Sequence, residues 1–191
     1  ITAIAAGSEF MLALRSDGKV AAWGFNVDGD VTGMSGSGTA SANPVTLGGQ
    51  VLSNVITVAC GAVHALAIKS DHTVISWGSN YFGQTNVPAG LTDVVGVAGG
   101  YYHSLALKSD GTVVVWGDNS QGQLNVPAGL TDVVQVSAAG FYSLALKSDG
   151  TVVAWGGNGL GQLNVPVGLN DAVQIAAAFG HALALKSDGT I

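Results

Sequence analysis

Three histidines, His64, His103 and His181, occupy equivalent positions in a sequence that repeats itself. Imidazoles gathered in one place could bind a transition metal. Side chains one repeat apart rarely converge on a single ion, however, and Phe10 and Tyr142 take the same position in the other two copies. We therefore expect these histidines to make structural hydrogen bonds, and we expect neither a metal nor another cofactor.

Two further patterns suggest chemistry. Cys60 and His64 could form a nucleophile and base, but no third group is in register to orient the pair. The segment NVDGDV at 26–31 has the oxygen ligands of a calcium loop and lacks its closing glutamate, so a turn is the better interpretation. We expect no catalytic residue and no enzymatic activity.

The repeat itself is marked by two independent signals. Ser-Asp pairs begin at residues 16, 70, 109, 148 and 187, so the first step is 54 residues and the next three are 39. Trp-Gly pairs follow the same steps, with their tryptophans at Trp23, Trp77, Trp116 and Trp155. The chain is therefore one repeat domain, 1–191, with units 1–54, 55–93, 94–132 and 133–171 and a partial unit 172–191. The first unit is 15 residues longer, and we expect a Gly/Ser/Thr-rich surface loop at about 30–50.

Each unit has the pattern of short β-strands. Segments such as DVVQVSAAG, FYSLALKS and TVVAWG are rich in β-branched and apolar residues, and Ser-Asp-Gly between the last two indicates a tight turn. A fourth extended piece, NVPAGL, contains a proline. A sheet of about four strands cannot bury both faces alone, so neighbouring units must stack. The expected fold class is all-β, a β-propeller.

The motif AGxxxHSLALKSDGTVVxWGDNxxGQ, found at 98–123, resembles the regulator-of-chromosome-condensation repeat. The 39-residue period with GQxxVP is similar to the short repeats of bacterial members, among them propeller-type inhibitors of β-lactamases. This resemblance implies a seven-bladed protein–protein binder, and it favours a location outside the cytoplasm. About four and a half blades are present, so we expect part of a longer ring or a ring completed by another copy.

Packing explains why certain residues recur. Leu105/Leu107 and their equivalents should face adjacent blades, and the four tryptophans should fill the space between sheets. Small residues around Ala98–Gly100 should let the inner strands converge near a central channel. A turn glycine such as Gly111 suits positive φ, which His72 must adopt without that freedom.

Composition narrows the possible partners. The six basic residues are scattered singly among twelve acidic ones, for a net charge of −6, so we expect no nucleic-acid partner. No run approaches the ~20 apolar residues of a membrane-spanning helix, so we expect no membrane partner.

Variable aromatic residues at otherwise uniform positions are the best candidates for a binding face. They precede the repeated Leu-Ala-Leu strand, and our partner-binding candidates are Phe10, Tyr101, Tyr102, Phe141 and Phe179. Exposed aromatic side chains on one face are typical of interface hot spots. The leading hypothesis is a non-enzymatic scaffold that binds another protein through this aromatic loop face. The alternative is self-assembly, with the incomplete blade completed by another copy. Further alternatives are inhibition of a bacterial enzyme such as a β-lactamase and multivalent glycan binding.

Overall fold

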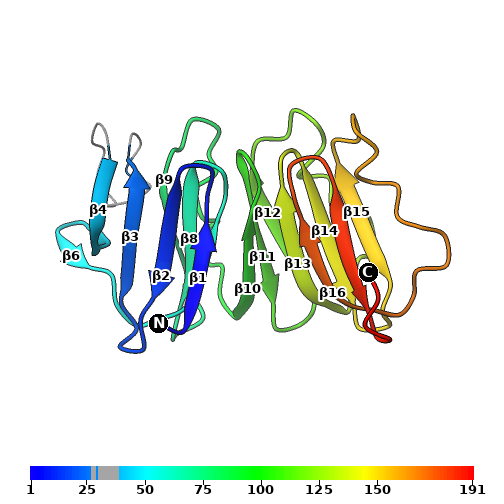
Figure 1. The fold of residues 1–191 in the computed structure, drawn as a ribbon, viewed down its shortest axis with the longest axis horizontal. Helices are drawn as coiled ribbons and strands as arrows, with labels where there is room; N and C mark the ends of the chain where they lie inside the picture. Colours follow the sequence, from blue (N-terminus) through cyan, green and yellow to red (C-terminus); the bar gives the residue numbers. More distant parts are fainter. Residues whose placement is uncertain (27–28, 30–38) are drawn as a thin grey trace.

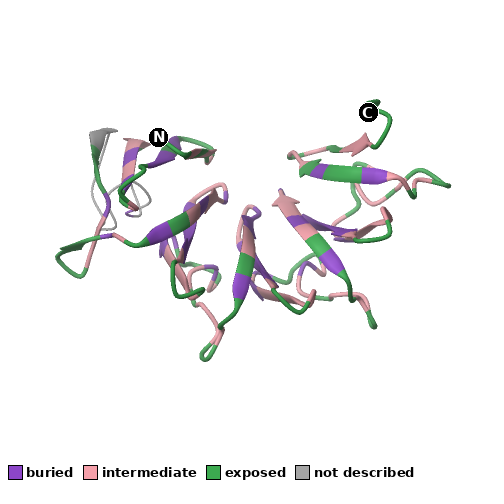
Figure 2. Cartoon of the chain, turned by 90° about the horizontal axis from the view of Figure 1, so that it is seen from below, coloured by how far each residue is buried: buried purple, intermediate pink, exposed green. Residues whose placement is uncertain are grey.

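The computed structural model describes residues 1–26, 29 and 39–191, and the regular structure within them is entirely β-strand. Short antiparallel strands lie side by side along the molecule (Figure 1). Seen from the end, the sheets are arranged in an arc around a common axis, with the two termini on opposite sides of its opening (Figure 2). This is the arrangement of propeller blades that the repeat predicts.

Three of the sheets are nearly identical three-stranded blades. Their strands are β7 (Val55–Cys60), β8 (His64–Lys69) and β9 (Val74–Gly78), then β10 (Val94–Gly99), β11 (His103–Lys108) and β12 (Val113–Gly117), then β13 (Val133–Ala139), β14 (Tyr142–Lys147) and β15 (Val152–Gly156). We predicted about four strands in each unit. The fourth piece, NVPAGL, forms turns instead, since its proline lacks the N–H that a paired strand donates.

The first and last blades differ from these three. The first has four strands, β1 (Ala3–Ala6), β2 (Phe10–Leu14), β3 (Val20–Phe25) and β4 (Thr39–Pro44), and is followed by the two-stranded ribbon β5 (Thr46–Leu47) and β6 (Gln50–Val51). The last pairs β16 (Ala172–Ala177) with β17 (Ala182–Lys186).

The expected surface loop at 30–50 is therefore corrected in its second half. Residues 39–44 pair with β3 as an outer strand, because an antiparallel edge can accept a further strand wherever backbone groups are free. Residues 30–38 lie outside the described part of the chain, as does most of the NVDGDV segment.

The Ser-Asp-Gly turns have the expected geometry. In the third blade Asp110 Oδ1 accepts hydrogen bonds from the backbone N–H and the hydroxyl of Thr112, at 3.0 and 2.6 Å. Gly111 has φ +78°, a conformation that costs glycine little. His72 has φ +61° at the same position of the second blade, so an ordinary side chain accepts the left-handed conformation there.

The core lies between blades rather than inside one. Leu105 and Leu107 of β11 pack against Trp155 of the following blade. Leu66 and Ile68 pack in the same way against Trp116. The two aliphatic side chains of a middle strand thus pack against the following blade, and the tryptophan of a third strand packs against the preceding blade. Trp23 of the first blade has no preceding blade within the chain and is only half-buried.

Candidate interaction face

Two sets of loops meet at one end of every blade. The loop after each Trp-Gly pair donates a backbone hydrogen bond to the loop before the middle strand: Asp118 N to the Tyr102 carbonyl at 2.9 Å, and Gly157 N to the Phe141 carbonyl at 2.8 Å. These bonds hold the variable positions of both loops together. The end they form is opposite to the Ser-Asp-Gly turns, because each middle strand begins at one end and finishes at the other.

Aromatic rings form a continuous run across three blades at this end. The Phe82 and Tyr102 ring centroids are 4.6 Å apart, and those of Tyr101 and Tyr102 are 4.5 Å apart with the rings edge to face. Tyr101 and Phe141 follow at 5.8 Å, with ring planes only 15° from parallel. Phe179 belongs to the last blade, where it lies beside Gly140 of the preceding blade, and 62% of its surface is exposed. We call these five residues the aromatic face.

The structure removes one predicted member and adds another. Phe10 is buried, with 2% of its surface exposed, so it does not belong to the face. Its ring lies over Gly7 and joins the core between the first two blades. Phe82 was missed, although it stands where Gln121 and Leu160 stand in later units. Variation after the Trp-Gly pair was the signal that could have revealed it.

Tyr142 is buried at the position that histidine takes in other units. Its hydroxyl contacts the backbone carbonyls of Ala178, at 2.9 Å, and His181. Burial raises the pKa of this phenol, and the hydrogen bond with Ala178 opposes that rise. Tyr142 therefore fastens the loop of the last blade and is not accessible to a partner.

The histidines lie between blades. His64 Nε2 is 2.8 Å from the hydroxyl of Ser104 in the next blade, and that hydroxyl donates to the Gln84 carbonyl at 2.8 Å. Because the serine proton is used in this way, the imidazole must donate and Nε2 carries the hydrogen. The same Gln84 carbonyl accepts the indole N–H of Trp116 at 2.8 Å. His103 Nε2 repeats the contact with the Ser143 hydroxyl at 3.0 Å.

Burial prevents these two imidazoles from acting as bases near neutral pH. Burial, together with a smaller contribution from the neighbouring His103, lowers the pKa of His64 to about 3. Burial also lowers the pKa of His103, to about 4, although Asp118 opposes the shift. His181 is exposed, since no blade covers it.

The pairing of Cys60 with His64 gains no geometric support. His64 directs Nε2 to Ser104, and Cys60 is a half-buried cysteine outside any disulfide at the mouth of the channel. Within the described part of the chain, no group of three or more His, Cys, Asp or Glu side chains is placed to bind a metal ion.

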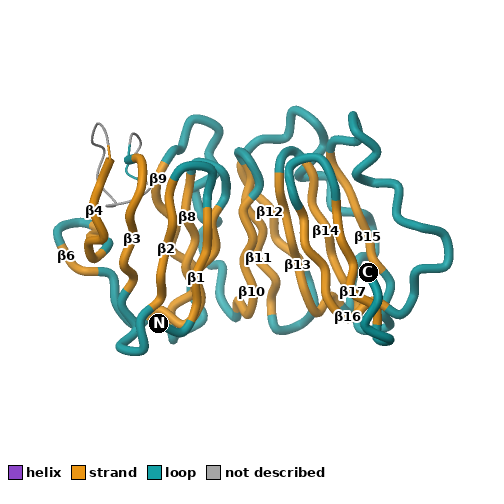
Figure 3. Tube along the Cα trace, in the orientation of Figure 1, coloured by secondary structure: helices purple, strands orange, loops and turns teal. Residues whose placement is uncertain are grey.

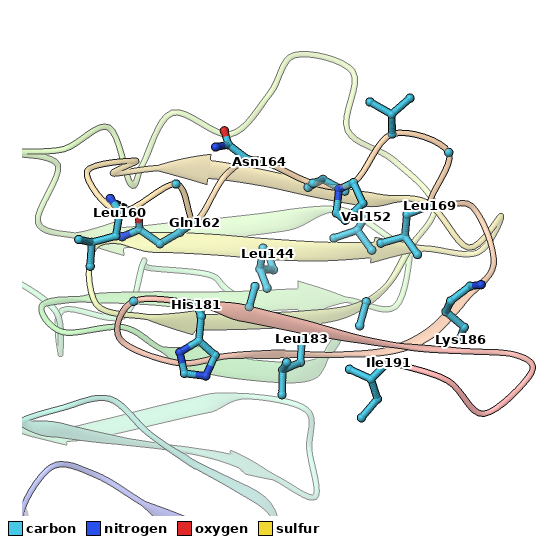
Figure 4. Close-up of a pocket in the computed structure, with 18 residues that line it drawn as sticks. Leu144, Val152, Leu160, Gln162, Asn164, Leu169, His181, Leu183, Lys186 and Ile191 are labelled. Atoms are coloured by element: carbon cyan, nitrogen blue, oxygen red, sulfur yellow. Dashed lines mark hydrogen bonds between the residues drawn. The ribbon is translucent and has the colours of Figure 1, made fainter.

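A hollow of about 720 Å³ runs along β17. Leu160, Gln162 and Leu169 line one side, and His181, Leu183 and Ile191 line the other (Figure 4). In every other blade this space holds the third strand, and Ile191 stands at the position equivalent to Val152, the first residue of β15. The groove is therefore part of the blade architecture and has no feature of a small-molecule site.

A second hollow, about 310 Å³, lies at the mouth of the central channel beside the aromatic face. Its walls come from the ends of the inner strands of all five units and consist mostly of glycine and alanine. Among the residues that line it are Ala62, Gly100, Tyr101, Gly140 and Phe179. The small residues let the inner strands approach closely.

The whole fold matches solved propellers. Yeast RCC1 (Prp20), in its structure bound to Kap60, superposes with a TM-score of 0.78 at 21% identity, covering 98% of this chain and 55% of that one. Human WBSCR16 gives a TM-score of 0.79 at 25% identity, covering 97% and 60%. Fold and core together define this chain as a β-propeller of the RCC1 type.

The sequence comparison agrees. The model of the regulator of chromosome condensation (RCC1) repeat matches residues 1–30, 55–84, 94–123 and 133–162, more than half of the chain, and the chain belongs to this repeat family.

Two relatives show how widely the repeat occurs. The ultraviolet-B receptor UVR8 of Arabidopsis thaliana is 34% identical over 87 residues, 46% of this chain and 19% of the receptor. The human E3 ubiquitin-protein ligase HERC2 is 40% identical over 82 residues, 42% of this chain and 2% of the ligase. The chain thus spans only a small part of these relatives. No helix in the described residues is long and apolar enough to cross a membrane.

Proposed function

We propose that this protein is a non-enzymatic scaffold that binds another protein through the aromatic face. The observation that carries the proposal is the run of four rings, Phe82, Tyr102, Tyr101 and Phe141, across three blades at one end of the molecule. Rings that contact one another are already ordered, so binding costs little side-chain entropy and buries a large apolar area.

The polar groups beside the rings favour a protein surface over a sugar. Asp118 accepts hydrogen bonds from Ser120 and from the Gln123 side chain, at 2.7 and 2.9 Å. Gln123 also accepts from the Gln121 N–H at 2.8 Å. A glycan site needs side chains free to bind hydroxyls, and these polar groups are occupied within the protein. The aromatic face is accordingly suited to apolar side chains.

A protein of similar fold binds other proteins. Yeast RCC1 (Prp20) has been solved bound to Kap60, and its binding to Gsp1p and histones has been studied. Binding of a bacterial enzyme such as a β-lactamase is a narrower version of our proposal, and it follows from the repeat resemblance alone.

Self-assembly is the second candidate, and the two end blades favour it. Ile4 is 69% exposed and Leu183 is 49% exposed, whereas their repeat equivalents Val58 and Leu144 are buried. Apolar faces of this kind invite contact with another copy. Molar mass from light scattering tests this candidate, since a concentration-independent 19 kDa species would exclude it.

The scaffold proposal is tested by affinity capture from an extract of the source cells. We expect the triple variant Tyr101→Ala, Tyr102→Ala, Phe141→Ala to lose a partner that the unaltered chain retains. A matched triple variant at the opposite end, Lys69→Ala, Lys108→Ala, Lys147→Ala, should retain it. Equal capture by both variants would show that the aromatic face is not the binding site.

A further inference from the structure

The mouth of the central channel has hydrogen-bond acceptors in excess. The backbone N–H of Ser8 donates to Ala62 O at 3.0 Å, that of Ala62 to Gly100 O at 3.0 Å, and that of Tyr101 to Gly140 O at 2.8 Å. In each case a loop N–H of one blade donates its hydrogen bond to a backbone carbonyl of the next blade. A carbonyl oxygen has two lone pairs, so the carbonyls of Ala62, Gly100 and Gly140, three residues that line the mouth, can each accept one further hydrogen bond.

The charged residues are distributed unequally between the two ends of the molecule. All six cationic side chains lie at the last residue of a middle strand or just after it, in or beside the Ser-Asp-Gly turns: Arg15, Lys19, Lys69, Lys108, Lys147 and Lys186. A middle strand of six residues separates them from the aromatic end by about 17 Å, which exceeds the ~8 Å screening length at physiological salt. The charged side chains described at the aromatic end are Glu9 and Asp118, both acidic.

Aromatic rings border the same mouth. Tyr101 and Phe179 line it directly, and Phe141 stacks on Tyr101. The face of such a ring attracts a cation, because its π-electrons carry negative charge. Carbonyl oxygens, π-faces and the absence of nearby positive charge all favour the same sign of ligand.

We propose that the channel mouth binds a cationic side chain, an arginine or a lysine, projecting from the protein partner. The guanidinium or ammonium group donates to the carbonyls of Ala62, Gly100 and Gly140, while its aliphatic stem lies against Tyr101 and Phe179. This inference rests on the proposed function, to which it adds the chemistry of the partner. A hollow of about 310 Å³ has room for one such side chain.

Titration of the 191-residue chain with small probes tests the inference without a partner. Nα-acetyl-arginine amide is compared with Nα-acetyl-citrulline amide, which has the same shape and no charge, by amide chemical shifts in NMR. We expect saturable shifts at Ala62, Gly100 and Gly140, with arginine binding about tenfold more tightly. Equal binding of the two probes, or shifts confined to Asp71, Asp110 and Asp149 at the turn end, would overturn the proposal.

A matched pair of variants adds a second test. Ala62→Lys places a positive charge at the mouth, and Ala62→Gln adds similar bulk without charge. Ala62 is half-buried in a loop, and circular dichroism of both variants checks the fold. Binding of acetyl-arginine amide should fall about fivefold or more in the lysine variant relative to the glutamine variant. Indistinguishable affinities would contradict the proposal.

The outcomes also separate this inference from the scaffold proposal. If partner capture depends on the aromatic face while the two Ala62 variants capture equally, the scaffold stands and the cationic side chain does not. If acetyl-arginine amide binds at the mouth while partner capture is unchanged by the aromatic triple variant, the mouth is a cation site and the scaffold proposal is wrong.

Discussion

The imidazole of His64 and the hydroxyl of Ser104 lie in adjacent blades and are joined by a 2.8 Å hydrogen bond. The equivalent pair in the next interface is His103 with Ser143, at 3.0 Å. Where the ring position is Phe10, the matching residue of the next blade is Ala65, and where it is Tyr142 the matching residue is Ala182. Serine thus accompanies histidine, because the imidazole uses the serine hydroxyl as its acceptor, whereas the Phe10 ring has no donor and the Tyr142 hydroxyl uses the Ala178 and His181 carbonyls.

This pairing predicts strong coupling between the two positions. Ser104→Ala should lower the free energy of unfolding by about 1–3 kcal/mol, since a buried N–H loses its acceptor. The double variant His64→Phe, Ser104→Ala recreates the Phe10–Ala65 pair and should be less destabilised than Ser104→Ala alone. Urea unfolding of both single variants and the double variant measures the coupling. Additive effects would show that the bond is energetically unimportant.

Acidification should destabilise the fold between about pH 6.5 and pH 4. The pKa of His64 is lowered to about 3 and that of His103 to about 4, whereas both titrate near 6.5 in the unfolded chain. The unfolded state therefore binds more protons in this window, and the stability contributed by neutral histidine is complete above pH 6.5 and lost as pH falls. Each histidine should contribute about 1.4 kcal/mol per pH unit.

Unfolding curves at several pH values between 7 and 4.5 check this prediction. The carboxylates Asp110 and Asp149 have pKa values lowered to about 2 by their bonds to the neighbouring threonines, so their contribution is lost mainly below pH 4. The variant His64→Phe, Ser104→Ala should halve the pH slope. If the dependence of the unfolding free energy on pH is unchanged in this variant, groups other than His64 must cause it.

Ser79→Asp should stabilise the second blade. The buried Nε2 of Gln84 has no hydrogen-bond partner, whereas the equivalent Nε2 of Gln123 donates to Asp118 at 2.9 Å. Ser79 stands where Asp118 stands one unit later. Supplying the missing acceptor should raise the free energy of unfolding by about 0.5–1.5 kcal/mol, and Asp118→Ser should lower it. Thermal unfolding decides, and a loss of stability in Ser79→Asp would contradict the explanation.

Gly100→Ala should be strongly destabilising, because a Cβ there would lie 2.0 Å from Cε1 of His103. The buried ring cannot move aside, so we expect a loss of about 1–3 kcal/mol. Gly96→Ala in β10, the strand that ends just before Gly100, is the control, since its Cβ would meet Leu107 at 3.4 Å. If both variants lose a similar amount of unfolding free energy, backbone flexibility, and not contact with the His103 ring, is the reason that glycine is needed at position 100.

The propeller architecture could be predicted from the sequence because every unit repeats the same pattern of strand and turn residues. Ser-Asp-Gly and Trp-Gly recur in phase, so the signal for a turn and for a third strand is strengthened by every copy. The alternation of Leu105 and Leu107 with small residues indicates which side faces the next blade. The second half of the insertion was misread, because the tendency of residues 39–44 to form a strand arises from the free edge of β3 and not from their own composition.

The candidate site depends on three-dimensional positions that the repeat does not encode. Phe10 and Phe82 are both aromatic, yet one ring is buried over Gly7 and the other contacts Tyr102 at the surface. The register of the repeat placed Phe10 among the candidates, and only the packing of neighbouring blades excluded it. By itself the sequence determined the repeat, the strands and the order of the blades, since these follow from local patterns. The tertiary structure decided which rings are exposed and which residues line the mouth of the channel, because both depend on contacts between blades.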